Sequence, residues 1–214
     1  MEKPNPLKES LGNGMRNLWD LMVVNWLWFL CSLPIVTVGP ATCALYGVAL
    51  KLARNEPVYA AKDFFRFFRE NLKPALVLGL LVIVLLTVSA GDIYFALQLS
   101  GSLRTLYLVL GMMLAAVALT VASYGFALQA MFENPMKTQL ANVFKLAFLA
   151  PGKTISLWMI TILPVLLIVG LPLNVVAPLG FLYLICGASG PAYLNSRILR
   201  GIFDKVNGSP VVPQ

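Results

Sequence analysis

Stretches without a single charged residue divide the chain. Four of them cover 21–50, 74–91, 105–132 and 154–196. A helix needs about 20 apolar residues to cross the hydrocarbon layer of a bilayer, which is about 30 Å thick. At about 1.5 Å per residue, the run 154–196 would extend about 65 Å as one helix, so it is expected to cross twice. This spacing of charges is typical of a small membrane protein with several spans.

The pattern predicts an all-α, polytopic helical membrane protein that forms a single membrane domain over 1–214, with about six apolar segments. The turn between the last two spans is expected at Leu171–Asn174, because Pro172 has no amide to donate and Asn174 favours turns. The expected order is a cytoplasmic amino-terminal segment (1–17), a broken double segment (18–53), an amphipathic cytoplasmic helix (57–73), spans at 75–95, 105–131, 154–171 and 175–195, and a cytoplasmic tail (196–214).

The first apolar run allows more than one topology, because prolines interrupt it. It can cross once as a kinked helix, cross twice at about 18–33 and 35–53, or turn back near Pro34–Pro40. Cytoplasmic loops are enriched in Lys and Arg, so the distribution of cations discriminates between these readings. Two passes leave only Arg104 outside and fifteen basic residues inside, whereas a single crossing divides them twelve to four. We therefore expect two passes, a plasma-membrane location and cytoplasmic termini.

An internal repeat with an offset of 78 residues is also expected. Residues 44–57 match residues 122–135 at six of fourteen positions, including a Tyr-Gly pair and the final Pro. The flanks repeat as well, which predicts a parallel duplication over about 35–95 and 113–173. Small residues in the matched stretch would let another helix approach closely, and we favour such packing over a substrate path.

Residues 61–73 form an amphipathic pattern at helical spacing. Its apolar side carries phenylalanines and its polar side carries mainly Lys and Arg. Such a helix can lie in the headgroup plane against anionic lipid, or it can dock a cytoplasmic partner. Nucleic acid is not expected as a partner, because acidic residues interrupt the cations and the helix adjoins a membrane. The candidate partner or lipid face consists of Phe64, Phe65, Phe68, Lys62, Arg66 and Arg69.

The composition agrees with a membrane location and gives little sign of catalysis. Apolar residues make up 59% and charged residues 12%, against about 45–50% and about 25% in soluble domains. The chain has no histidine, and its three cysteines lie apart within apolar runs, so no zinc site or disulfide framework is expected. Asn25 is deep in an apolar run and is expected to form a hydrogen bond between helices. We predict that the chain is not an enzyme and has no cofactor, metal or catalytic residues.

The break in the first run is a second candidate site. Gly39-Pro40-Ala41 recurs as Gly190-Pro191-Ala192 near the other end of the chain. A broken helix at membrane depth frees backbone groups, which must be satisfied by neighbouring helices or by a water-filled cavity. Either the break is a packed kink, or it lines a small polar site made of Pro34, Thr37, Gly39 and Pro40.

The same residues carry a family resemblance. Asn25-x-x-Trp28, the stretch Ser32-Leu33-Pro34-x-x-Thr37-x-Gly39-Pro40-Ala41 and Asp63-Phe64-Phe65-x-x-Phe68-x-x-Asn71 resemble the YesL-like family of small bacterial integral membrane proteins. The resemblance covers about 10–200, although the carboxy-terminal half matches mainly in hydropathy. It implies a plasma-membrane protein, often encoded among carbohydrate-uptake and polysaccharide-degradation genes, and it assigns no ligand or catalytic residues.

Three functions are therefore considered. The leading hypothesis is an accessory membrane component that works with a carbohydrate-uptake permease through its cytoplasmic face. The alternatives are a small transporter or channel with a pathway between the two repeats, and a regulatory or sensory membrane protein. The sequence leaves the oligomeric state and the substrate open.

Overall fold

The computed structural model describes residues 6–132, 134–170, 172, 180, 183 and 185–207. Every regular element in these ranges is helical, which confirms the all-α class. The turn expected at Leu171–Asn174, apart from Pro172, and the first part of the span expected over 175–195 (175–179, 181, 182 and 184) lie outside the described residues, as do both chain ends.

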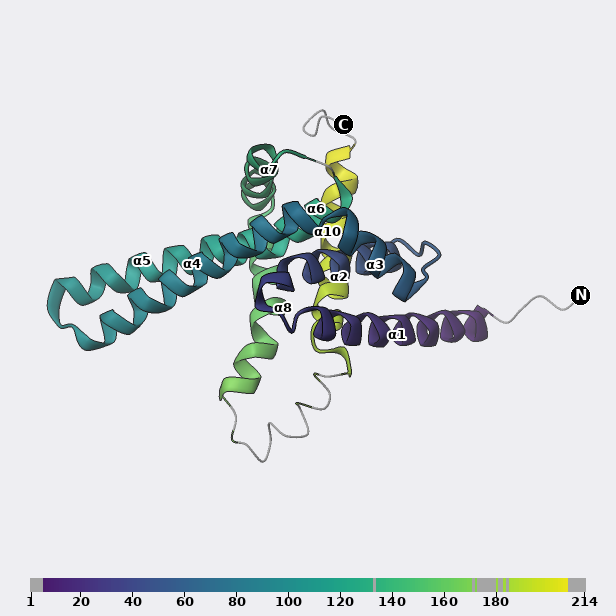
Figure 1. Ribbon diagram of the computed structural model, residues 1–214, viewed down its shortest axis with the longest axis horizontal. Helices are drawn as coiled ribbons and strands as arrows, with labels where there is room; N and C mark the ends of the chain where they lie inside the picture. Colours follow the sequence, from purple (N-terminus) through teal and green to yellow (C-terminus); the bar gives the residue numbers. More distant parts are fainter. Residues whose placement is uncertain are drawn as a thin grey trace, which may run out of the picture.

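Figure 1 shows the order of the helices along the chain. Two long helices, α4 and α5, pair side by side, and the second continues through a π-helical turn, η2, into α6. The elements are α1 (Pro6–Cys31), the short 3-10 helix η1 (Ile35–Thr37), α2 (Val38–Ala53), α3 (Ala60–Glu70), α4 (Leu72–Gln98), α5 (Gly101–Thr120), η2 (Val121–Gly125), α6 (Phe126–Met131), α7 (Met136–Leu149), α8 (Pro151–Gly170) and α10 (Ser189–Asn207).

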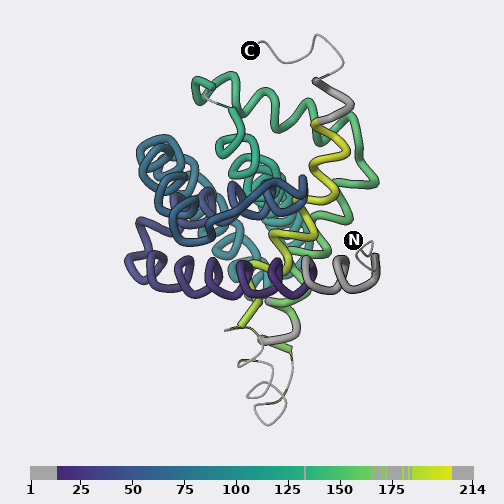
Figure 2. Tube along the Cα trace, turned by 90° about the vertical axis from the view of Figure 1, so that its right-hand side faces the viewer, coloured from purple at the N-terminus to yellow at the C-terminus, as the bar shows by residue number. Residues whose placement is uncertain are grey.

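Two arms extend from a common body. The α4–α5 hairpin forms one arm and α8 forms the other, at a large angle to the first (Figure 1). Figure 2 looks nearly along the α4–α5 arm, while α8 and α10 still run up and down the view. The helices α1, α2, α3, α6 and α10 make up the body from which both arms extend.

Three helices in the described part of the chain are long and apolar enough to cross a membrane: Ile35–Ala53, Leu72–Gln98 and Gly101–Met131. A fourth is obtained only if Met136–Leu149 and Pro151–Pro164, which are bent by 107°, count as one broken span. The six expected segments are thus matched only in part. The helix α1, which contains the pass expected at 18–33, is not among these candidates because charged and polar residues extend into its middle.

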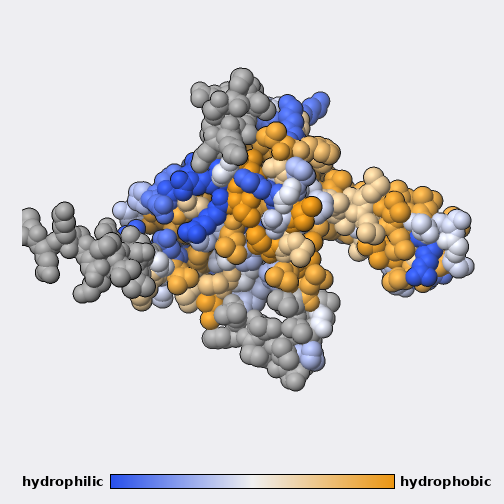
Figure 3. All heavy atoms as spheres, turned by 180° about the vertical axis from the view of Figure 1, so that it is seen from behind, coloured by the Kyte–Doolittle hydropathy of each residue, from blue (hydrophilic) through white to orange (hydrophobic). Residues whose placement is uncertain are grey.

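The α4–α5 arm exposes an apolar surface to its surroundings. Only 22% of the most apolar window of each helix is buried inside the protein. Figure 3 shows this surface as a continuous apolar zone that ends in a polar tip. A soluble protein rarely exposes such a large apolar area, so lipid is the surrounding that suits it. Its large exposed side chains include Val77, Val84, Val88, Leu106, Val109, Met112 and Met113.

The helix α2 is the centre of the body. Thirteen of its sixteen residues are buried, and it contacts α1, α3, α4, α6 and α10. The two stretches of the proposed repeat lie against each other here, with the Cys43 thiol 3.7 Å from the Phe126 carbonyl oxygen. In both stretches a buried helix is followed by a short helix and then by a long apolar helix. The duplication itself stays a prediction.

The last helix differs from the expected boundaries. The sequence predicts a span that ends at 195 and a separate tail, whereas α10 begins at Ser189 and continues to Asn207. Leu199, Ile202 and Phe203 are buried against the body, so one face of the expected tail forms part of the core. The apolar positions Leu199, Ile202 and Phe203 are spaced three and four apart, which is the helical spacing that this packing requires.

A glycine pair sets the distance between α2 and α4. A Cβ built on Gly79 would lie 2.7 Å from the Cα of Gly39, and one on Gly39 would collide with the backbone of Ala75. Small residues at a crossing allow helix backbones to approach closely, which gains van der Waals contact in an apolar environment. The break before α2 is therefore fixed beside the first third of α4.

We predict that Gly79→Ala lowers the stability of the protein by roughly 1–3 kcal/mol, because the added methyl group meets backbone that cannot yield easily. Thermal unfolding of the purified protein in detergent measures this as a lower midpoint. Gly91→Ala on the same helix is the matched control, since nothing lies within 4 Å of its Cβ position. Equal midpoints for the two variants would contradict the close crossing.

Candidate functional site

The helix α3 is held on α2 by a buried carboxylate. Asp63 Oδ2 accepts hydrogen bonds from the backbone N–H of Tyr59 and from Lys51 Nζ, both at 3.0 Å. Its other oxygen, Oδ1, lies 3.0 Å from Arg66 Nη2. Asp63 is in the first turn of α3 and Lys51 is in the last turn of α2, so both charges also suit the dipoles of their helices. This arrangement fixes the start of one helix to the end of the other.

The environment of Asp63 shifts its pKa. Burial of the carboxyl group raises the pKa, but the Tyr59 N–H group and the cations of Lys51 and Arg66 together lower it more. The pKa of Asp63 therefore lies below its ordinary value, and the group is charged at neutral pH. The amphipathic pattern placed Asp63 on the solvated polar face, whereas the structure buries it.

The phenylalanines of α3 divide between core and surface. Phe64 is fully buried, and its ring stacks on Phe68 with the centroids 6.3 Å apart. Phe67 packs on Gly47 of α2, where any side chain would overlap its ring. Of the three phenylalanines assigned to the partner or lipid face, Phe64 is therefore removed, because protein covers it. Phe65 is 41% exposed and stays on the surface.

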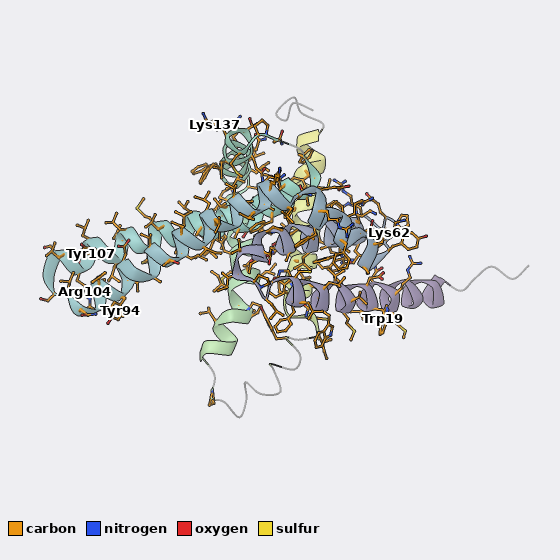
Figure 4. The ribbon with its side chains drawn as sticks, viewed as in Figure 1. Trp19, Lys62, Tyr94, Arg104, Tyr107 and Lys137 are labelled. Atoms are coloured by element: carbon orange, nitrogen blue, oxygen red, sulfur yellow. The ribbon has the colours of Figure 1, made fainter. Side chains whose placement is uncertain are left out.

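The surface that α3 leaves open is basic and aromatic. Lys62, Arg66 and Arg69 are exposed beside Phe65, and Tyr59 is exposed just before the helix. We call these five residues the α3 surface. Figure 4 shows Lys62 on the body, at the opposite end of the molecule from the tip of the α4–α5 arm.

The side chain of Thr37 holds the break together. Its hydroxyl lies 2.6 Å from the Cys31 carbonyl oxygen and 2.8 Å from that of Pro34, so it joins the end of α1 to η1. Gly39 and Pro40 are buried, whereas residues 33–36, Pro34 among them, are exposed. Both readings of the break, a packed kink and a small polar site, stay predictions.

A cluster of polar side chains connects α1, α2 and α10 beside the break. Trp28 Nε1 donates to Thr42 Oγ1 at 3.1 Å across the break. Three positions before Trp28, Asn25 Oδ1 accepts the backbone N–H groups of Ala188 and Ser189 at 2.9 and 3.0 Å. Asn25 thus satisfies donors at the start of α10, which confirms its expected hydrogen bond between helices.

The cluster surrounds a cavity of about 200 Å³ between α1, α2, α8 and α10. Asn195 on α10 donates from Nδ2 to the Tyr46 hydroxyl and to Thr161 Oγ1, both at 3.1 Å. Both Gly-Pro-Ala stretches lie near it: Pro191 and Ala192 line the cavity directly, and Thr42 follows Ala41. Sequence reasoning missed Asn195 as a site residue. The sequence did contain a sign of its role, because Asn195 is an isolated amide in an apolar stretch and lies just after the second Gly-Pro-Ala stretch.

We predict that Asp63→Asn destabilises the protein at neutral pH by about 2 kcal/mol, since Lys51 and Arg66 lose their charged partner. Because the folded-state pKa is lowered, the stabilising contribution of Asp63 is present above its unfolded pKa of about 3.9 and disappears as the pH falls through the folded value. Unfolding midpoints measured from pH 7 to pH 3 should therefore fall less for Asp63→Asn than for the wild type. Asp92→Asn is the control, and a similar loss in both variants would contradict the role of Asp63.

Comparisons with known proteins connect this architecture to a family. The family model described as "Protein of unknown function, DUF624" matches residues 21–93, which include the broken helix, α3 and most of α4. The chain is 29% identical over 157 residues to "Uncharacterized protein YesL" of Bacillus subtilis (strain 168), a match that covers 68% of this chain and 72% of that protein. No solved structure matches significantly. The expected resemblance is confirmed: this chain is similar to the YesL-like family.

Proposed function

We propose that this chain is an integral plasma-membrane protein that serves as an accessory component of a bacterial carbohydrate-uptake system. The carbohydrate context comes from what the YesL-like resemblance implies. Two features of the structure support the proposed mode of action: an apolar arm suited to the bilayer and an exposed basic surface at its base. The exposed α3 surface, held in place by Asp63, is the observation that carries the proposal.

The length of the α4–α5 arm supports a crossing of the bilayer. Lys73 and Asp92 bound the charge-free part of α4 and lie 19 positions apart, which is about 28 Å along a helix. This distance is close to the roughly 30 Å of the hydrocarbon layer. Tyr94, Arg104 and Tyr107 gather at the far tip (Figure 4), as expected of side chains at a membrane–water interface.

The position of the break argues against two complete passes over 18–53. Gly39 meets α4 at Gly79, only seven positions from the first residue of α4, or about 10 Å. On this account α1 and α2 enter the bilayer from the cytoplasmic side and turn back within one leaflet. The end of α1 beside the break, which exposes Trp26 and Phe29, would then contact lipid near the interface.

The cations orient the molecule. Lys62 on α3 and Lys137 on α7 lie away from the tip that carries Arg104 (Figure 4). Together with the positive-inside rule, this supports a cytoplasmic side for α3 and α7 and an outside location for the tip of the arm. A re-entrant α1–α2 pair keeps the amino terminus on the same cytoplasmic side as two passes would.

The α3 surface would bind the cytoplasmic face of the permease. A docking surface works best when its side chains are held before binding, because less conformational entropy is then lost. Phe64, Asp63 and Phe67 fix the helix from beneath and leave Lys62, Phe65 and Arg69 free to contact the partner. Anionic headgroups near the membrane would share the same cations.

Co-purification from native membranes tests this role. We expect a carbohydrate-uptake permease to be recovered with the tagged wild-type protein and to be lost from a variant with Lys62→Glu, Phe65→Ser and Arg69→Glu. A variant with Lys137→Glu and Phe148→Ser is the control, since it changes an exposed cation and an exposed phenylalanine on α7. Equal recovery by both variants, or substrate flux in liposomes that contain this chain alone, would contradict the accessory role.

Cysteine accessibility tests the orientation. In a chain whose native cysteines are replaced, Arg104→Cys should react with a membrane-impermeant maleimide in intact cells. Lys3→Cys should react only after the membrane is permeabilised. Labelling of position 3 in intact cells would show that the amino terminus is outside.

A further inference from the structure

We propose that the cavity between α1, α2, α8 and α10 is a binding site for one small neutral molecule with adjacent hydroxyl groups. This site is separate from the α3 surface and does not depend on the accessory role. Trp28, Thr42, Tyr46, Thr161, Pro191 and Asn195 are among the residues that line it. At about 200 Å³, the cavity is smaller than the roughly 300–1,000 Å³ that is usual for drug-sized ligands.

The hydrogen bonds of the lining leave a defined set of free groups. Asn195 Nδ2 donates to the Tyr46 oxygen, so the phenolic proton of Tyr46 is still available. Trp28 donates to the Thr42 oxygen, which likewise leaves the hydroxyl proton of Thr42 available. Within the part of the chain that the structure describes, neither proton has an acceptor. The wall therefore offers two hydroxyl donors.

Asn195 fixes the orientation of the Tyr46 hydroxyl in the cavity wall. Asn195 is 1% exposed, and its Oδ1 is buried away from the open space. Its Nδ2 donates to Tyr46 and to Thr161 and so joins three of the helices around the cavity. The Tyr46 oxygen is thereby occupied, and its proton is directed elsewhere.

These groups specify the chemistry of the occupant. Two hydroxyl donors, from Tyr46 and Thr42, around a small space match neighbouring hydroxyl groups on a ligand, whose oxygens can accept from both. No Asp, Glu, Lys or Arg is among the described lining residues, so an ionised ligand would lose its hydration without gaining an opposite charge. The Trp28 and Tyr46 rings supply apolar walls for the carbon skeleton.

The surrounding backbone is shaped to leave this space. Pro164 stands inside α8 beside the cavity and removes a hydrogen bond from that helix, while the turn at Gly187-Ala188 precedes α10. Discontinuous helices beside a polar site occur where membrane proteins bind solutes. The second Gly-Pro-Ala stretch thus lines the cavity through Pro191 and Ala192, and the first ends one residue before Thr42, which also lines it.

Binding of xylitol to the full-length protein in glycerol-free detergent tests the site. Xylitol is neutral and has five adjacent hydroxyl groups, and gluconate serves as a charged molecule with a similar row of hydroxyls. Saturation-transfer NMR and the fluorescence of the tryptophans report binding. We expect saturable binding of xylitol and none of gluconate over the same concentration range.

Two tyrosine variants make the test specific. Tyr46→Phe removes one donor from the cavity and should weaken xylitol binding about threefold to tenfold, the value of one neutral hydrogen bond. Tyr124→Phe is the matched control, because Tyr124 occupies the equivalent repeat position, is buried and bonds Thr154 away from the cavity. The absence of saturable xylitol binding to the wild type, equal affinities of the two variants, or equal binding of gluconate would overturn the proposal.

Discussion

The contact between Gly39 and Gly79 determines how closely α2 lies against α4. With no side chain on either residue, α2 can lie against the backbone of α4, and the break between α1 and α2 is fixed beside that point. The remaining body helices are arranged around α2, which α1, α3, α4, α6 and α10 all contact. A larger residue at either glycine would separate α2 from α4 and disturb every one of these contacts.

Polar groups complete the body where apolar packing alone would leave backbone groups unpaired. Asp63 joins α2 to α3, and Asn25 binds the N–H groups at the start of α10. Both side chains connect different helices, and Asn25 connects helices that are far apart in the sequence. Many helix arrangements would bury a similar apolar area, but only one of them lets these polar groups form their hydrogen bonds. The same principle explains the cavity, because Asn195 joins α10 to α2 and α8.

The sequence predicted the helical class, the approximate bounds of α4 and the hydrogen-bonding role of Asn25, because charge-free length and isolated polar residues report directly on membrane burial. It did not predict which phenylalanines of α3 are buried. The helical period shows that Phe64 and Phe65 share a side of α3, but it does not show which rings another helix covers. The packing of α3 depends on α2, where Gly47 leaves room for the ring of Phe67. The depth of the break depends likewise on Gly79, forty residues beyond Gly39, which no local pattern reveals. The prediction of six apolar segments rests on the length of the charge-free runs. The length of a run does not show where the chain bends or which way each helix points, so it does not fix the number of spans.

The depth of the α1–α2 break is the most direct test of this account. In a chain without native cysteines, Leu33→Cys and Ser100→Cys can be compared for their reaction with a membrane-impermeant maleimide in intact cells. If the glycine crossing holds the break within the inner leaflet, Ser100→Cys reacts and Leu33→Cys does not. If Leu33→Cys reacts as fast as Ser100→Cys, the first two helices cross the membrane completely, and the proposed arrangement around α2 is wrong.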